Sequence, residues 1–89
     1  MILGVSLTAE HIRIGNRDSL ANSPICHAIR AAGGRDVLMI GTGFVELVIG
    51  TPERRLFELP SEATTWDLQF ERGREVAPID FVITEVVNG

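Results

Sequence analysis

The clearest helix start in this chain is Asn22-Ser23-Pro24-Ile25-Cys26-His27-Ala28-Ile29-Arg30. A serine side chain caps a helix well and proline is favoured at the first helical position, so Ser23 and Pro24 together fix where this helix begins. The glycine pair at 33–34 then offers a stop signal. We therefore expect a helix from Pro24 to about Ala32.

The segment before this helix predicts a strand, a short helix and a loop. Residues 2–7 are apolar and rich in strand formers, so they are expected to form the first strand. Thr8 then caps a helix of about two turns, which Gly15 or Asn16 ends. Polar turn formers fill residues 16–22, which we expect to form a surface loop.

Strand-like runs follow the helix. Residues 35–40 and 44–49 are separated by Gly41-Thr42-Gly43, and a three-residue connection that contains glycine predicts an antiparallel hairpin. After a turn at 50–53, residues 54–59 are expected to form a third strand. Its Arg and Glu side chains favour an outer or edge position in the sheet.

The C-terminal part predicts one amphipathic helix and one strand. Ala63, Trp66 and Phe70 recur at a spacing that places them on one face of a helix. Gly73 ends this helix, and the alternating pattern of residues 79–87 predicts the final strand.

The order of elements is therefore strand, helix, helix, strand, strand, strand, helix, strand. It predicts an α+β fold in a single domain over residues 1–89, with an antiparallel sheet and its helices packed on one face. A chain of 89 residues has room for one hydrophobic core. The expected core consists of Val5, Leu7, Ile25, Ile29, Val37, Met39, Val45, Leu47, Phe57, Trp66, Phe70, Phe81 and Ile83.

Composition narrows the class of protein. Hydrophobic residues make up 45% and charged residues 22%, which is typical of a globular protein. One cysteine cannot form an internal disulfide, no basic-then-apolar signal segment is found, and no apolar run approaches the roughly 20 residues that span a bilayer. We expect a cytoplasmic protein without a membrane segment. The net charge of −4 argues against a direct nucleic-acid partner.

The start of the helix at Pro24 also raises a chemical hypothesis. Cys26 would lie in the first turn, where unpaired N–H groups and the helix dipole favour a thiolate. A ligand site built from Ser23, Cys26, His27 and His11 is the corresponding prediction. The competing interpretation is a small buried cysteine in the core.

No catalytic residue set, metal site or cofactor is expected. Cys26 and His27 are adjacent, and adjacent helical residues point about 100° apart, so the base for Cys26 would have to be His11. An oxyanion donor set is missing, and no Cys/His pair has zinc-like spacing. Gly41-Thr42-Gly43 lacks the Lys-Ser/Thr of a phosphate loop and leads into a strand, so it is interpreted as a hairpin turn.

Strand patterning predicts an interface. Residues 37–40 and 45–49 are apolar on both sides in places, and a two-layer monomer would leave one of those sides exposed to water. We therefore expect a homodimer that forms through the sheet or its edge. The candidate interface residues are Val37, Met39, Arg54 and Arg55.

Several segments resemble small proteins of bacteriophages and high-GC bacteria. The matching stretches are Thr8-Ala9-Glu10-His11-Ile12, residues 23–30, residues 59–63 and residues 70–81. In that family a Cys-Pro-Ile-Ala helix follows the Thr-x-Glu-His-Ile start. Here Ser23 stands in place of the family's Cys and Cys26 in place of its Ala, so no role of the family's cysteine transfers. The resemblance implies a phage-like origin and a shared fold, and no activity.

Three functions are compatible with these observations. The favoured hypothesis is a small non-enzymatic interaction module, phage-derived, that binds a host or phage protein, with inhibition of host defence as one concrete form. Its net negative charge favours association with a basic partner. The alternatives are a ligand-sensing module, in which the loop at 16–23 and the helix start at Pro24 hold a small anion, and a thiol enzyme centred on Cys26.

Overall fold

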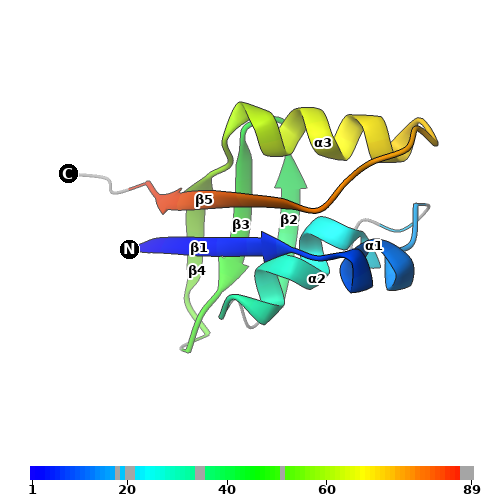
Figure 1. The fold of residues 1–89 in the computed structure, drawn as a ribbon. Coiled ribbons are helices and arrows are strands. Elements are labelled where there is room, and N and C mark those ends of the chain that lie inside the picture. The colour runs from blue at the N-terminus through cyan, green and yellow to red at the C-terminus, as the bar shows by residue number, and fades with distance from the viewer. Residues whose placement is uncertain (18, 20–21, 34–35, 51, 87–89) are drawn as a thin grey trace.

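In the computed structural model the described residues form eight helices and strands in the expected order (Figure 1). It describes residues 1–17, 19, 22–33, 36–50 and 52–86. The elements are β1 (Ile2–Leu7), α1 (Ala9–Ile14), α2 (Pro24–Ala31), β2 (Asp36–Gly41), β3 (Phe44–Val48), β4 (Arg54–Glu58), α3 (Ser61–Glu71) and β5 (Ile79–Glu85). The α+β class and the predicted order are confirmed.

A few predicted positions fall elsewhere. The strand expected at 79–87 ends at Glu85. Several predicted features include residues that lie outside the described parts of the chain: the loop (18, 20 and 21), the helix stop and following strand start (34 and 35), the turn at 50–53 (51) and the end of the last strand (87). Across the described parts of the chain, none of the helices is long and apolar enough to cross a bilayer.

The five strands form one antiparallel sheet in the order β1-β5-β4-β3-β2. The edge position expected for the strand at 54–59 is wrong, because β4 pairs with β3 on one side and with β5 on the other. β1 and β5 pair along their whole length, from Ile2↔Thr84 to Leu7↔Ile79. In contrast, the register of β4 against β5 covers only Phe57↔Glu85 and Glu58↔Thr84. The β1–β5 pair therefore crosses the β2–β3–β4 meander instead of running alongside it, and the sheet is strongly curled (Figure 1).

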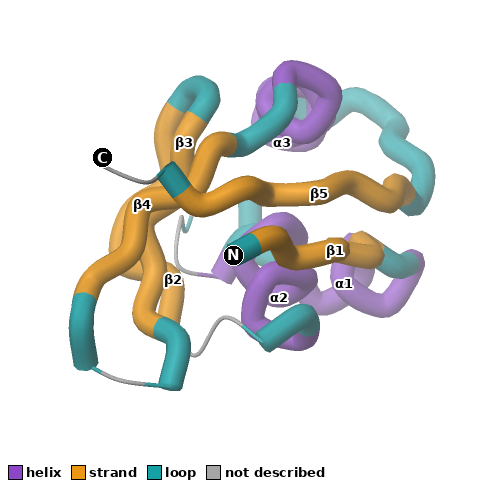
Figure 2. The backbone as a smooth tube through the Cα atoms, turned by 90° about the vertical axis from the view of Figure 1, so that its left-hand side faces the viewer, coloured by secondary structure: helices purple, strands orange, loops and turns teal. Residues whose placement is uncertain are grey.

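The core lies on the inner face of this curled sheet, where the helices pack. In both views α3 lies on the β5 side and α2 on the β1 side (Figures 1 and 2). α2 contacts β1 and β2, the two strands at opposite ends of the sheet, and so fills the space between them. Its residues Pro24, Ile25, Cys26, Ala28 and Ile29 are buried. All predicted core residues except Met39 are buried.

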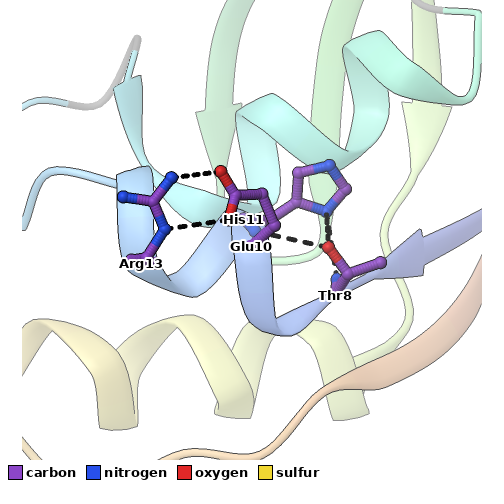
Figure 3. Close-up of polar contacts among 4 residues, drawn as sticks. All are labelled: Thr8, Glu10, His11 and Arg13. Carbon is purple, nitrogen blue, oxygen red and sulfur yellow. Dashed lines mark hydrogen bonds and ion pairs between the residues drawn. The ribbon is translucent and has the colours of Figure 1, made fainter.

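The starts of α1 and α2 follow from side-chain caps. Ser23 caps α2, because its Oγ accepts a hydrogen bond from the Cys26 N–H at 3.4 Å, and Pro24 occupies the first helical position. Thr8 caps α1 in a reciprocal arrangement: its Oγ1 accepts from the His11 N–H at 3.3 Å, and His11 Nδ1 accepts from the Thr8 N–H at 3.0 Å (Figure 3). His11 thus takes the place that Glu or Gln usually fills in such a cap.

Met39 is the one wrong core prediction, since 55% of its surface is exposed. The register of β2 against β3 shifts between Val37 and Met39. A β-bulge of this kind adds a residue and reverses the side-chain alternation beyond it. Met39 therefore lies opposite the outward Glu46, and Ile40 takes the inward position opposite Val45.

The hairpin between β2 and β3 is tighter than predicted. Gly41 pairs with Phe44, so the connection is the two residues Thr42 and Gly43. Gly43 has φ +84°, the left-handed conformation that the third residue of a type II turn requires. A Cβ at Gly41 would lie 2.6 Å from the Phe44 ring, so a larger residue there would require this exposed ring to move.

Candidate functional site

Cys26, the centre of the chemical hypothesis, is fully buried at the start of α2. Burial raises the pKa of the Cys26 thiol, and this effect outweighs the opposing hydrogen bond with Ser23 and the charge of Arg30. Desolvation thus opposes the thiolate that the helix start favours, and the burial of Cys26 agrees with the competing interpretation of a core cysteine. Ser23 is itself mostly buried as the cap, with 7% of its surface exposed, and Cys26 has no exposed surface.

The two histidines do not complete a site. The His11 ring turns toward Thr8 and takes part in the α1 cap (Figure 3). His27 is half-buried, and its pKa is lowered first by desolvation and then by the charges of Arg30 and His11. Among the described residues, no group of three or more His, Cys, Asp or Glu is placed to hold a metal ion.

A small cavity of about 90 Å³ lies where the loop after α1 meets α3. Its polar lining includes Ser19, Ser23, Asp67 and Glu71. Burial, with a further contribution from Glu71, raises the pKa of Asp67 to about 6. Two carboxyl groups and the Arg17 guanidinium share the wall of this cavity, so its charges do not select an anion. This geometry does not favour the anion-sensing alternative.

Arg17 lines the same cavity but is already engaged. Its Nε donates a hydrogen bond to the Phe70 carbonyl at 3.0 Å, and its guanidinium lies 5.4 Å from the centre of the Phe70 ring. Arg17 also lines an open groove of about 790 Å³, whose charged lining residues are Arg17, Arg74 and Glu75. Charges of both signs in a wide groove favour no single class of small ligand.

Exposed apolar side chains collect instead on the outer face of the sheet, the face turned away from the helices. Neighbouring strands align three of them in a row. Val86 donates a backbone hydrogen bond to the Leu56 carbonyl, Leu56 pairs with Glu46, and Glu46 pairs with Met39. We call Met39, Leu56 and Val86 the apolar row; 55%, 42% and 43% of their surfaces are exposed.

The four predicted interface residues do not lie on one surface of the structure. Met39 belongs to the apolar row, and Arg54 lies on the same outer face with its Nη1 3.5 Å from Glu46 Oε1. Val37 is buried in the core. Arg55 alternates to the opposite side of β4 and lies 3.8 Å from Glu85. The outer-face row could not be predicted from the sequence, because Leu56 and Val86 become neighbours only through the β4–β5 pairing.

No protein-family model matches this chain, and comparisons with curated proteins and with solved structures give no significant match either. The function must therefore be inferred from the geometry of the chain's own residues.

Proposed function

We propose that this protein is a cytoplasmic, non-enzymatic binding module that acts by contacting another protein through the outer face of its sheet. The apolar row is the observation that carries this proposal. Its three side chains come from β2, β4 and the residue after β5, and each has more than a third of its surface exposed. Exposed apolar side chains that share one face of a sheet with polar neighbours are a feature of protein interfaces.

The charges around the apolar row suit a specific partner. Glu46 lies within the row between Leu56 and Met39, and Arg54 reaches it from the neighbouring strand. With a net charge of −4, the chain would associate fastest with a basic protein, because complementary fields steer encounters. The resemblance to phage proteins suggests a host or phage protein as partner, and inhibition of a host defence protein is one form that such binding could take.

The buried thiol supports a non-enzymatic function. A nucleophilic cysteine needs access to its substrate and a lowered pKa, whereas Cys26 has no exposed surface and a raised pKa. Its place among the core residues accounts for a small apolar side chain there without any chemistry.

A comparison of two leucine variants tests this function. Leu56→Arg places a charge in the apolar row, whereas Leu68→Arg makes the same change on α3, where Leu68 is equally exposed at 43%. Tagged wild type and both variants are used to capture proteins from host cells, and the bound proteins are quantified by mass spectrometry. We expect a protein that binds wild type and Leu68→Arg equally and is lost by at least about tenfold with Leu56→Arg. Equal retention by all three would contradict the proposal.

We also propose that the protein forms a homodimer, as the strand pattern predicts. Because the outer face of the sheet binds the partner protein, the second copy must bind through another surface.

A further inference from the structure

A groove of about 550 Å³ lies over β1 and β5. Buried and exposed residues alternate along both strands, and the exposed residues in the groove lining are Gly4, Ser6, Asp80 and Val82. Gly4 pairs with Val82, and Ser6 pairs with Asp80. A Cβ on Gly4 would meet nothing within 4 Å. The outer face of the β1–β5 pair therefore forms the floor of the groove, and this floor is open at Gly4.

The start of α3 also contributes to the groove. α3 lies on the side of β5 that is turned away from β1 (Figure 1), and Pro60 and Glu62 belong to the groove lining. Pro60 is half-buried, and Glu62 is exposed in the first turn of the helix. Val82 has 50% of its surface exposed. The groove thus combines an apolar part, formed by Pro60 and Val82, with a polar part.

The charged side chains of this groove are acidic. Within the described part of the chain, Glu62 and Asp80 are its charged lining residues, and neither forms an ion pair with another described residue. The groove beside Arg17 differs, because it carries charges of both signs. The apolar row differs as well, because Arg54 pairs with Glu46 there. Two carboxylates without a cationic partner give the β1–β5 groove a negative potential, which attracts a cation and repels an anion.

We propose that this groove binds a basic segment of the partner protein, with one lysine or arginine side chain of that segment lying in the groove. Such a side chain has an apolar stem and a charged end, which matches the two parts of the groove. Its methylene groups cover Pro60 and Val82, and its charged end pairs with Glu62 and Asp80. The Ser6 hydroxyl can accept a further hydrogen bond from the same side chain.

This inference deepens the proposed function and rests on it, because it assigns a chemical feature to the same partner. Val82 lies on the same side of the β5 segment as Val86 of the apolar row, since residues four apart in an extended segment share a side. The two are about 13 Å apart along that segment. An interface of ordinary size has about 20–30 residues on each side, so one partner can contact both places.

A titration of the pure protein with hexaarginine, followed by the amide signals in two-dimensional NMR, tests the groove directly. Hexacitrulline, which has nearly the same shape and no charge, is the control peptide. Hexaarginine is expected to shift the signals of Gly4, Ser6 and Val82 in a saturable way, and more weakly at high salt. Hexacitrulline is expected to leave these signals unchanged.

Two double variants separate the groove from the net charge of the chain. Glu62→Gln with Asp80→Asn removes both carboxylates of the groove, and we expect it to raise the Kd for hexaarginine at least about tenfold. Asp36→Asn with Glu53→Gln removes two exposed carboxylates elsewhere and should change the Kd by about twofold or less. Gly4→Val changes no charge and places a side chain on the open floor of the groove, so it should also weaken binding. Circular dichroism checks that each variant is folded.

Several results would overturn this inference. Equal weakening by the two double variants would assign the binding to net charge, and shifts centred outside the groove would place the peptide elsewhere. In capture from host cells, the Glu62→Gln/Asp80→Asn variant is expected to lose the same partner as Leu56→Arg. A partner that is lost with Leu56→Arg but retained by the double variant contradicts the groove and leaves the proposed function intact. Retention by Leu56→Arg contradicts the proposed function, whereas the peptide titration still decides whether the groove binds a basic segment.

Discussion

The Arg17 side chain joins two segments that lie 53 residues apart, because its Nε donates to the Phe70 carbonyl at 3.0 Å while its guanidinium lies 5.4 Å from the centre of the Phe70 ring. The carbonyl is in the last turn of α3, where the negative end of the helix dipole favours a cation. Phe70 also stacks on Trp66 at 5.6 Å. Arg17 thus connects the loop after α1 to the last turn of α3.

Arg17→Ala is expected to lower the free energy of unfolding by about 1–2 kcal/mol, since it removes a charge-assisted hydrogen bond and a cation–π contact together. Urea denaturation followed by Trp66 fluorescence measures this change. Arg13→Ala is the matched control, because Arg13 pairs with Glu10 on the exposed surface of α1. An effect of Arg13→Ala equal to that of Arg17→Ala would contradict the structural role of Arg17.

Asp67→Asn is expected to stabilise the protein at neutral pH. Desolvation, and to a lesser extent Glu71, raises the pKa of Asp67 to about 6, so the folded state holds this proton more tightly than the unfolded state. The stability that Asp67 contributes is fully present below its unfolded pKa and is lost as pH rises through about 6. The substitution should therefore raise the free energy of unfolding by about 1 kcal/mol at pH 7.5, after allowance for solvent screening, and change it little at pH 4.

Chemical denaturation at pH 4, 6 and 7.5 tests the Asp67 prediction. Glu62→Gln, which removes a carboxylate from the exposed first turn of the same helix, is the control and should not stabilise the protein. If Asp67→Asn raised the free energy of unfolding more at pH 4 than at pH 7.5, the prediction would be contradicted.

Cys26 is expected to react with a thiol reagent only when the protein unfolds. Its side chain has no exposed surface, and burial raises the pKa of the thiol. Labelling with a chromogenic disulfide at pH 7.5 should therefore be slow in buffer and rapid in concentrated urea. Rapid labelling of the folded protein would revive the thiol-enzyme hypothesis.

Trp66→Ala is expected to lower the free energy of unfolding by about 3–5 kcal/mol, because it leaves a large cavity in the core. Trp66→Phe should cost less, about 1–2 kcal/mol, since the ring is kept and only the indole hydrogen bond to the Ala77 carbonyl, at 2.8 Å, is lost. Thermal melting monitored by circular dichroism measures both. Similar melting temperatures for wild type and Trp66→Ala would contradict the burial of this side chain.

Local signals made most of the fold predictable. Ser23 and Pro24 mark the start of α2, and the spacing of Ala63, Trp66 and Phe70 marks the buried face of α3. These signals act within one or two turns of the chain, so sequence alone carries them. The inner residues of the strands were predictable for the same reason, because alternation is a local property.

Features that depend on pairing were not predictable. Met39 faces outward because a bulge shifts the register of β2, and no residue of the run 36–41 marks that bulge. Leu56 and Val86 form one surface only after β4 and β5 pair, and Arg17 reaches Phe70 only after α1 and α3 pack. At Cys26 the sequence left two interpretations open, because the position in the helix favours a thiolate whereas burial, which opposes it, is a tertiary property.

Photo-crosslinking from the outer face tests the central claim most directly. A photoreactive amino acid replaces Leu56 in one variant and the equally exposed Leu68 in another, and both are irradiated in the host cell. The account predicts a covalent adduct with a second kind of protein from position 56 and none from position 68. No adduct at position 56, or the same adducts from both positions, would contradict binding through the outer face of the sheet.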